Sequence, residues 1–454
     1  MNHILPLSQW LSKSRPDDTV IAWLGDHTWT LGQLRYDVAL LVDELQGQQD
    51  EERWALCFEN SYLFIVALLA TLSAGKTPVI PGHCRVSLLE EQRSLFHGVL
   101  SDQALDWHGV LRVVSSANTS APEATVLPTI TPSRCIELYT SGSTGQPKRV
   151  IKSIAALDKE AALLADRFGG QLSGCRVVAS VVPQHLYGLT FRIFLPLALG
   201  MPLHAAMLYY AEQLAALDHQ HRYLFVSSPA FLKRLDHKLT PPPVKVILSA
   251  GGMLSWQHVL DTQRWFGVWP DEIYGSTETG ILGWRHRHQD MIPWLPFPGV
   301  RITPEDDAFR VFSPLIAQQE GLLLDDILQL EDNGLFHLVG RHGRVVKIEE
   351  KRISLSEVER RLMALEGIRD AAALPVTRGG RQGIGAVLVL EEPLRRMWQQ
   401  TSGKKLELSW RRALLPWLEP VAIPRYWRIV DEIPVNSMNK RVYAQLQETF
   451  HESP

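Results

Sequence analysis

Residues 139–148, Tyr-Thr-Ser-Gly-Ser-Thr-Gly-Gln-Pro-Lys, join hydroxyl and glycine residues to a lysine within one short loop. Glycine lets backbone N–H groups approach an anion closely, hydroxyl groups add hydrogen-bond donors, and lysine adds positive charge. These groups together suit a polyphosphate. The apolar run 136–139 before the loop predicts a strand, and the Val150-Ile151 pair after it predicts a second, short strand. We therefore expect a fold in which a strand lies on each side of this loop.

The second predicted strand distinguishes this loop from the P-loop motif. In a P-loop the lysine directly follows the last glycine, and a helix begins there. Here Lys148 lies three residues after Gly145, and Pro147 stands between them. A kinase or GTPase of the P-loop class is therefore disfavoured. A surface loop without a ligand would also be rich in Ser, Thr and Gly, so other segments have to decide between the two interpretations.

Further polar stretches follow strand-like apolar runs along the chain. They are Ser-Ala-Gly-Gly-Met-Leu at 249–254, Tyr-Gly-Ser-Thr-Glu-Thr-Gly at 274–280, Asp326 fifteen positions before Arg341, Lys-Ile-Glu-Glu-Lys-Arg-Ile-Ser at 347–354, and Pro-Val-Asn-Ser-Met-Asn-Lys at 434–440. Several such stretches in a set order are more specific than any one of them. As a set they resemble the adenylate-forming superfamily, which contains acyl- and aryl-CoA synthetases, adenylation domains of peptide synthetases and firefly-type luciferases.

The resemblance covers nearly the whole chain, from Thr-Trp-Thr-Leu-Gly-Gln-Leu at 28–34 to Lys440. It implies an α/β protein with a large N-terminal domain, residues 1–341, built of layered α/β subdomains with a small β-rich portion. A small mobile α+β domain, residues 342–454, follows and carries the catalytic lysine. Gly343 takes the hinge position, where glycine offers wide backbone freedom.

The pattern of apolar residues agrees with this organisation. Helical spacing and apolar runs predict alternating helices and strands in the first part of the chain, which is typical of a doubly wound α/β layer. From residue 300 onward short alternating strands predict a β-rich region, and after Gly340 the pattern predicts a small α+β unit. The predicted helices are 31–45, 62–74, 155–168 and 356–365, and the predicted strands include 54–58, 78–80, 177–182, 223–226, 244–248, 309–312, 327–330, 335–339, 371–375 and 385–390.

The resemblance assigns a set of residues to ATP. They are Thr140, Ser141, Gly142, Ser143, Thr144, Gly145 and Lys148 around the β- and γ-phosphates, Gly251, Gly252, Tyr274 and Gly275 on the side of the base, and Asp326 and Arg341 at the ribose. An ionised carboxylate is only an acceptor, so Asp326 has room for both ribose hydroxyls. Tyr274 would pack against adenine; its alternative role is that of a core aromatic.

Joining a carboxylate to the α-phosphate of ATP sets two anions against each other, so charge must be neutralised and the geometry held in line. By resemblance, Lys440 stabilises this charge, Thr277 contacts the α-phosphate, and Glu278 binds Mg²⁺. Magnesium favours oxygen ligands together with substrate phosphates, so one glutamate suffices. The alternative for Lys440 is an exposed lysine near the C-terminus, since most lysines are exposed.

The acid would lie near His185, Gly251, Ser276 and Ile281. His185 belongs to a His-x-x-Gly motif that ends at Gly188, and it could orient the acid or be structural. The pair formed by His286 and His288 has no cysteine or carboxylate cluster beside it, so a surface pair is favoured over a metal site.

The expected function is that of an ATP-dependent acid–thiol ligase, which forms an acyl-adenylate and pyrophosphate and then a thioester. The thiol is that of CoA or of the phosphopantetheine arm of an acyl carrier protein. Residues 347–353 resemble, more weakly, small ligases of aryl polyene and fatty-acid-like pigment pathways, which transfer an aryl or acyl group. This resemblance suggests a benzoate-like acid, such as a hydroxybenzoate, or a medium-length acid. Alternatives within the superfamily are an adenylation-only enzyme and a luciferase-like oxygenase. A catalytically silent nucleotide-binding protein is another, although both Lys440 and Glu278 are present.

The chain departs from the family pattern at four places: Arg149 and Glu350 each replace a glycine, Gly343 replaces the hinge aspartate, and Met438-Asn439 replaces Asn-Gly. Glu350 falls in a segment that helps to form the pantetheine tunnel in relatives. The departure there leaves the first half-reaction intact and puts the thiol acceptor in doubt.

The bulk properties are those of a cytoplasmic enzyme. At ~150 residues per domain, 454 residues allow two or three domains. The net charge of −3 gives no basic field for nucleic acid. The 4 cysteines are widely spaced without a C-x-x-C pair, which indicates a reducing compartment. We expect no signal peptide, and the longest apolar run, 62–75, is too short to span a bilayer.

Overall fold

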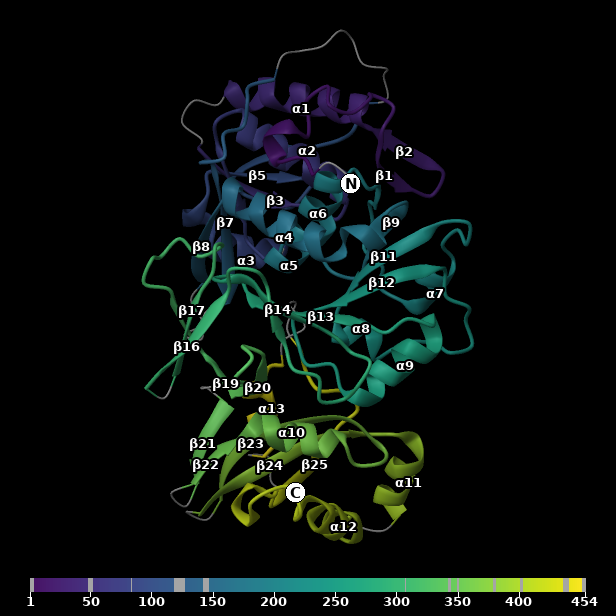
Figure 1. The fold of residues 1–454 in the computed structure, drawn as a ribbon, viewed down its shortest axis with the longest axis vertical. Helices are drawn as coiled ribbons and strands as arrows, with labels where there is room; N and C mark the ends of the chain where they lie inside the picture. The colour runs from purple at the N-terminus through teal and green to yellow at the C-terminus, as the bar shows by residue number, and fades with distance from the viewer. Residues whose placement is uncertain are drawn as a thin grey trace.

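The computed structural model describes residues 4–47, 52–82, 84–117, 127–141, 147–306, 308–341, 344–348, 351–378, 381–400, 403–435 and 441–450. Two large sheets and the helices between them form the upper part of the molecule, and a smaller α+β unit lies below them (Figure 1). The chain starts in the upper part and ends in the lower one.

The first sheet has six strands in the order β6-β5-β3-β4-β7-β8. All neighbours are parallel except β7 and β8, which form an antiparallel pair at one edge. The strands are β3 (Arg53–Cys57), β4 (Thr77–Ile80), β5 (Gly98–Ser101), β6 (Val110–Val113), β7 (Cys135–Ser141) and β8 (Pro147–Ser153). The prediction of a strand on each side of the loop is confirmed, and β8 is longer than the Val150-Ile151 pair indicated.

The second sheet has nine strands in the order β15-β14-β13-β12-β11-β9-β10-β1-β2. Its centre, from β13 to β1, is parallel, and the strands at its two ends are antiparallel to their neighbours. The strands are β1 (Val20–Leu24), β2 (His27–Thr30), β9 (Cys175–Ala179), β10 (Leu203–His204), β11 (Arg222–Ser227), β12 (Val244–Ser249), β13 (Asp271–Ser276), β14 (Gly280–His286) and β15 (Leu295–Pro296). β9 ends three residues before the predicted end at 182.

A layer of helices lies between the two sheets and fills their shared core. The helices are α1 (Leu31–Gln46), α2 (Ser61–Ser73), α4 (Ile154–Leu172) and α6 (Leu195–Leu199), preceded by a π-helical segment, Leu189–Phe194. One apolar cluster joins these helices to strands of both sheets. Helix α2 is buried on nearly every face, as expected for a helix that is apolar all round. Its start is fixed by Asn60, whose side chain accepts the N–H groups of Tyr62 and Leu63.

Shorter helices complete the upper part. They are α3 (Val86–Glu91), α5 (Leu186–Gly188), α7 (Ala211–Ala215), α8 (Pro229–Leu232) and α9 (Trp256–Phe266). A small β-rich region follows, as predicted, with β16 (Arg301–Glu305), β17 (Ala308–Phe312) and β18 (Leu322–Leu324) in one sheet and β19 (Asp326–Leu330) with β20 (Phe336–Arg341) in another.

The lower unit contains a hairpin, a three-stranded sheet and several helices among its described residues. These are β21 (Val345–Ile348), β22 (Lys351–Ser354), α10 (Leu355–Met363), β23 (Ile368–Arg378), β24 (Arg381–Leu390), α11 (Glu392–Gln400), α12 (Lys404–Leu414), β25 (Tyr426–Ile429) and α13 (Tyr443–Glu448). Two apolar clusters of its own stabilise it, and their buried residues begin at Ile348. In the part of the chain that the structure describes, no helix has the length and apolarity needed to cross a bilayer.

Candidate active site

The predicted phosphate loop lies between β7 and β8. In the register of this pair, Thr140 stands opposite Lys148 and Ser141 opposite Pro147. Thr140 is half-buried and Lys148 is exposed. Gly142, Ser143, Thr144 and Gly145 lie outside the described residues. The two ends of the loop are therefore held side by side, and a strand, not a helix, follows Lys148.

The turn between β13 and β14 brings Glu278 to this hairpin. The Nζ atom of Lys148 lies 2.9 Å from Oε1 of Glu278. Burial raises the pKa of the Glu278 carboxyl, but the hydrogen bond from Lys148 and further hydrogen bonds outweigh it, so the net shift is downward. Glu278 is therefore held as a carboxylate, with its side chain 33% exposed. Two predicted site residues that are 130 positions apart in the sequence meet here.

Hydrogen bonds inside the turn fix its shape. Ser276 N–H donates to Oγ1 of Thr279 at 3.1 Å, and Thr279 N–H donates to Oγ of Ser276 at 3.2 Å. Gly275 is required next to them, because a Cβ at this position would lie 2.2 Å from the carbonyl oxygen of Gly280. Thr277 is half-buried beside Glu278. The motif Tyr-Gly-Ser-Thr-Glu thus encodes a tight turn as well as functional side chains, and Thr279 is a contributor that the sequence analysis missed.

The predicted nucleoside residues also come together. The hydroxyl of Tyr274 donates to Oδ2 of Asp326 at 2.7 Å, and Asp326 stands opposite Arg341 in the β19–β20 pair. The Tyr274 ring packs against Trp294 and Phe336, with ring centroids 5.7 Å apart in both pairs. Tyr274 therefore orients the Asp326 carboxylate and is held by an aromatic cluster. The packing of the Tyr274 ring against other aromatic rings is compatible with its predicted role beside the adenine base.

Gly251 and Gly252 follow β12, next to the carboxyl end of β13. β11, β12 and β13 are parallel, so their carboxyl ends meet at one edge of the sheet. A ligand commonly binds at such an edge in α/β proteins. Apart from Gly251 and its two chain neighbours, no atom of the described residues lies within 4 Å of the place where a Cβ of Gly251 would be. The predicted base-side residues and the Glu278 turn therefore share one edge.

His185 stands at the start of α5, close to the end of β7. A Cβ at Gly82 would lie 3.4 Å from Cε1 of His185 and 3.1 Å from the carbonyl oxygen of Tyr139. Three residues on, a Cβ at Gly188 would lie 1.8 Å from the carbonyl oxygen of Val182, so only glycine fits there. The glycine of the His-x-x-Gly motif is thus explained by close packing. Ile281, predicted near the acid, has its side chain 4% exposed in the main core cluster.

A buried pair of opposite charges lies beneath the Glu278 turn and was missed in the sequence. Lys152 on β8 and Glu160 on α4 are 5% and 3% exposed. Burial lowers the pKa of Lys152 and raises the pKa of Glu160, while their opposite charges act against both shifts. Glu160 lies three residues after the buried Leu157, so it falls on the apolar face of the predicted helix 155–168. A charged residue on that face was the sequence signal for a buried charge.

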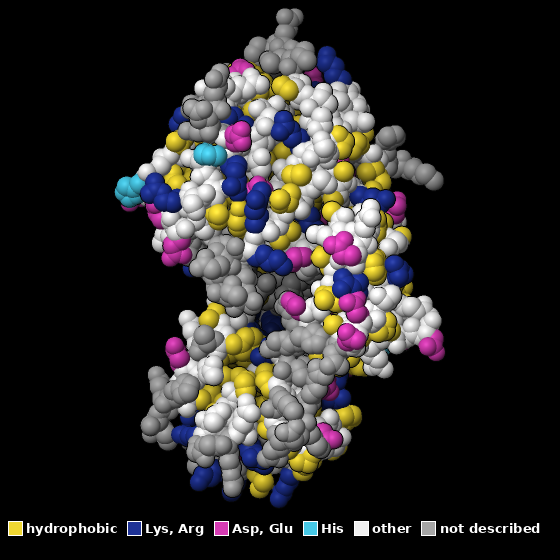
Figure 2. Space-filling view, turned by 90° about the vertical axis from the view of Figure 1, so that its left-hand side faces the viewer, with side chains coloured by type: hydrophobic (Ala, Val, Ile, Leu, Met, Phe, Trp, Pro, Cys, Tyr) yellow, Lys and Arg dark blue, Asp and Glu magenta, His cyan; other side chains and the backbone are white. Residues whose placement is uncertain are grey.

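The two remaining predicted residues, Lys440 and Gly343, lie outside the described residues. Arg441, next in the chain after Lys440, is described: its Nη2 lies 2.5 Å from Oδ1 of Asp370 in β23. The other carboxylate oxygen of Asp370 lies 3.4 Å from Nζ of Lys233, at the end of α8. The Asp370 carboxylate therefore joins the lower unit to the upper part. Figure 2 shows a hollow at the waist between these two parts, with acidic and basic side chains around it.

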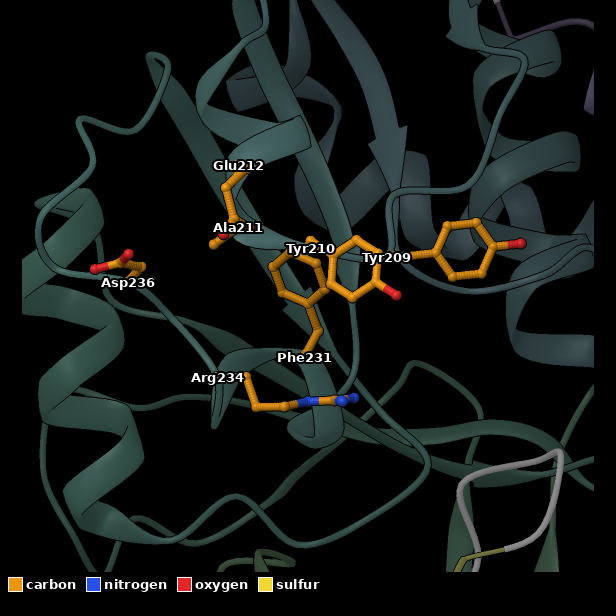
Figure 3. Close-up of a pocket in the computed structure, with 7 residues that line it drawn as sticks. All are labelled: Tyr209, Tyr210, Ala211, Glu212, Phe231, Arg234 and Asp236. Atoms are coloured by element: carbon orange, nitrogen blue, oxygen red, sulfur yellow. The ribbon is translucent and has the colours of Figure 1, made fainter.

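A surface pocket of about 180 Å³ lies elsewhere, between α7 and α8 (Figure 3). It is lined by Tyr209, Tyr210, Ala211, Glu212, Phe231, Arg234 and Asp236. None of the residues predicted for ATP or for the acid lines it. Charges of both signs stand at its rim, so it favours no single class of ligand.

This chain is similar to known proteins in sequence and in fold. A family model described as AMP-binding enzyme matches residues 93–314. The 4-coumarate–CoA ligase of Halorhodospira halophila is 30% identical over 314 residues, which cover 66% of this chain and 73% of the relative. The 4-coumarate–CoA ligase of Cereibacter sphaeroides is 30% identical over 241 residues, or 51% of this chain and 54% of that relative.

Among solved structures, ATP-bound MatB from Rhodopseudomonas palustris aligns with a TM-score of 0.81 at 20% identity, covering 99% of both chains. At this identity the match concerns the fold. It confirms the predicted fold class, an adenylate-forming α/β architecture with a small β-rich portion and an α+β unit at the C-terminus.

Proposed function

The chain belongs to the family of AMP-binding enzymes, and on this premise we propose that it is an ATP-dependent acid–thiol ligase. A carboxylate attacks the α-phosphate of ATP, pyrophosphate leaves, and an acyl-adenylate forms. A thiol then attacks the acyl carbon and releases AMP. The observation that carries this proposal is the contact of Lys148 with Glu278, which joins the predicted phosphate loop to the Tyr-Gly-Ser-Thr-Glu turn.

In the first half-reaction, Lys148 and the loop before it bind the β- and γ-phosphates, and Thr277 contacts the α-phosphate. Asp326, oriented by Tyr274, accepts the ribose hydroxyls, and Arg341 lies beside it. Lys440 places an ammonium group at the α-phosphate, where charge develops in the transition state. These roles are part of the proposal and rest on the family pattern.

Glu278 has the chemistry to hold Mg²⁺. It offers hard carboxylate oxygens, and it is held ionised and partly open to solvent. Magnesium prefers a site built from one or two carboxylates together with substrate phosphates. When bound, Mg²⁺ neutralises phosphate charge. Mg²⁺ would then replace Lys148 at the Glu278 carboxylate, and Lys148 would bind phosphate oxygens.

The proposed acid is an aryl acid of the hydroxybenzoate kind, bound near His185, Gly251, Ser276 and Ile281. The weak resemblance of residues 347–353 to aryl polyene pathway ligases supports an aryl acid, as does the name of the 4-coumarate–CoA ligases. The proposed acceptor is the phosphopantetheine thiol of CoA or of an acyl carrier protein, in a pigment or fatty-acid-like pathway. ATP and such thiols are abundant in the cytoplasm, where we place the reaction.

We also propose that residues 1–341 and 342–454 are two domains that move relative to each other about Gly343. The separate apolar clusters support this division, because their buried residues end at Phe336 on one side and begin at Ile348 on the other. Among the described residues, the buried apolar side chains on the two sides of the boundary therefore belong to different clusters.

The test of the function is acid-dependent exchange of pyrophosphate into ATP over a panel of aryl and straight-chain acids. We expect exchange with hydroxybenzoates or related aryl acids, and thioester formation when CoA or a phosphopantetheinylated carrier protein is added. Exchange without any thioester would identify an adenylation-only enzyme. ATP binding with no exchange over the whole panel would contradict the ligase function.

A Tyr274→Phe substitution removes the hydroxyl that orients Asp326 but keeps the ring in its aromatic cluster. A hydrogen bond to a charged group contributes about 1.5–3 kcal/mol, and part of this is lost from ribose binding. We expect the KM for ATP to rise about three- to tenfold, with little change in the KM for the acid. Tyr210→Phe, on an exposed ring, is the control. Equal changes in both KM values would contradict the role of Tyr274 at the nucleoside.

A further inference from the structure

Lys148 and Lys152 project from the same face of β8, because side chains alternate along a strand. Both reach Glu278, at different atoms. Lys148 contacts the carboxylate, whereas Nζ of Lys152 donates to the main-chain carbonyl oxygen of Glu278 at 2.8 Å. The Lys148 side chain is 61% exposed, and Lys152 is 5% exposed. Solvent and phosphates can thus compete for Lys148, while the contact of Lys152 belongs to the interior.

Glu160 holds the other end of the same turn. Its Oε1 accepts the N–H of Ile281 at 2.8 Å, and its Oε2 accepts the hydroxyl of Thr190 at 3.1 Å. Two side chains of opposite charge, from β8 and α4, therefore bind the main chain of the turn at positions 278 and 281. An ammonium group buried in a protein interior is costly unless it is paired and hydrogen-bonded. The buried carboxylate of Glu160 supplies the opposite charge for the ammonium group of Lys152.

An apolar residue could fill the place of Lys152 in the core, and such a replacement of a buried charge is often neutral or stabilising. The strand needs no lysine at this position for its own sake. What the lysine adds is a donor for the carbonyl of Glu278. This contact joins the strand that follows the phosphate loop to the turn that carries the predicted metal ligand.

We propose that Lys152 is a positioning residue for Glu278, supported by Glu160. It fixes the main chain of Glu278, so that the carboxylate projects at a set place toward a metal–nucleotide complex. This inference rests on the proposed function, in which Glu278 binds the Mg²⁺ of MgATP. Lys152 itself touches no phosphate in this assignment and acts only through Glu278.

The test is the affinity for MgATP, compared with the affinity for ATP in EDTA, both measured by titration calorimetry without any acid. We expect Lys152→Met to weaken MgATP binding about tenfold, which is about 1.4 kcal/mol, and ATP binding in EDTA less than about twofold. Lys152→Arg, which keeps the charge and donors, should restore most of the MgATP affinity. Lys159→Met, on the exposed neighbour of Glu160, is the matched control and should change neither affinity.

A double-mutant cycle separates positioning from general damage to the fold. Because Lys152 acts through Glu278, Lys152→Met should add almost nothing to the MgATP defect of Glu278→Gln, whereas independent sites add. Thr190→Val is a milder variant that removes one hydrogen bond to Glu160, and we expect a two- to threefold loss specific to MgATP. It keeps the buried charge pair and so tests the same network if Lys152→Met folds poorly.

Equal losses with and without Mg²⁺, or additive losses in the cycle, would overturn the positioning role. The binding measurement needs no acid, so it tests the positioning role of Lys152 independently of the ligase function. Mg²⁺-specific losses in a protein without pyrophosphate exchange would support the role of Lys152 and overturn the ligase chemistry. Normal exchange with additive losses would overturn only the role of Lys152.

Discussion

Lys440→Ala is expected to lower the rate of acid-dependent pyrophosphate exchange by about 10³-fold. The α-phosphate gains negative charge as the carboxylate attacks it, and Lys440 is the residue assigned to that charge. Removal of a single preorganised donor to such a transition state costs about 10²–10³ in rate. ATP binding should change little, because the phosphate loop, Glu278 and Asp326 remain. The measurement is pyrophosphate exchange together with the Kd for MgATP.

Lys404→Ala is the matched control, since Lys404 is an exposed lysine at the start of α12, in the same part of the chain. It should leave the exchange rate unchanged. Unaltered pyrophosphate release by Lys440→Ala would contradict its catalytic assignment. A parallel loss of MgATP affinity and exchange rate would instead make Lys440 a binding residue for the nucleotide.

Glu278→Gln is expected to lower kcat/KM for MgATP about 100-fold and to raise the Mg²⁺ concentration needed for half-maximal rate. The substitution keeps the size of the side chain and removes the charge that pairs with Lys148 and would bind the metal. The main-chain contacts of the turn with Lys152 and Glu160 do not involve the carboxylate, so the fold should be kept. The rate is measured as a function of Mg²⁺ at saturating acid.

Glu212→Gln changes an exposed glutamate on α7 and serves as the control. An unchanged Mg²⁺ requirement in Glu278→Gln would show that the carboxylate does not hold the metal. A lower melting temperature with a normal Mg²⁺ requirement would assign Glu278 to the stability of the turn alone.

Most helices and strands could be predicted from the residue pattern alone. The spacing of apolar residues and continuous apolar runs predicted α1, α2, α4, α10 and the central strands of both sheets to within a few residues. These segments are predictable because they bury one face or all of their faces. The order of the polar motifs also indicated the family, because several such stretches in a set order are more specific than any one of them. The glycines of two motifs, Gly188 and Gly275, have a purely local reason, which is the close approach of another backbone.

Which of these groups meet depends on the packing of segments that lie far apart in the chain. The contact of Lys148 with Glu278, and that of Tyr274 with Asp326, join strands of different sheets that no local pattern relates. For the buried residues Lys152 and Glu160 the sequence offered one signal, a charged residue on the apolar face of a predicted helix, but it did not identify the partner. A charged residue in an apolar segment is stable only if a partner is buried with it, and that partner is chosen by the packing of α4 between the two sheets, not by the residues next to it in the chain.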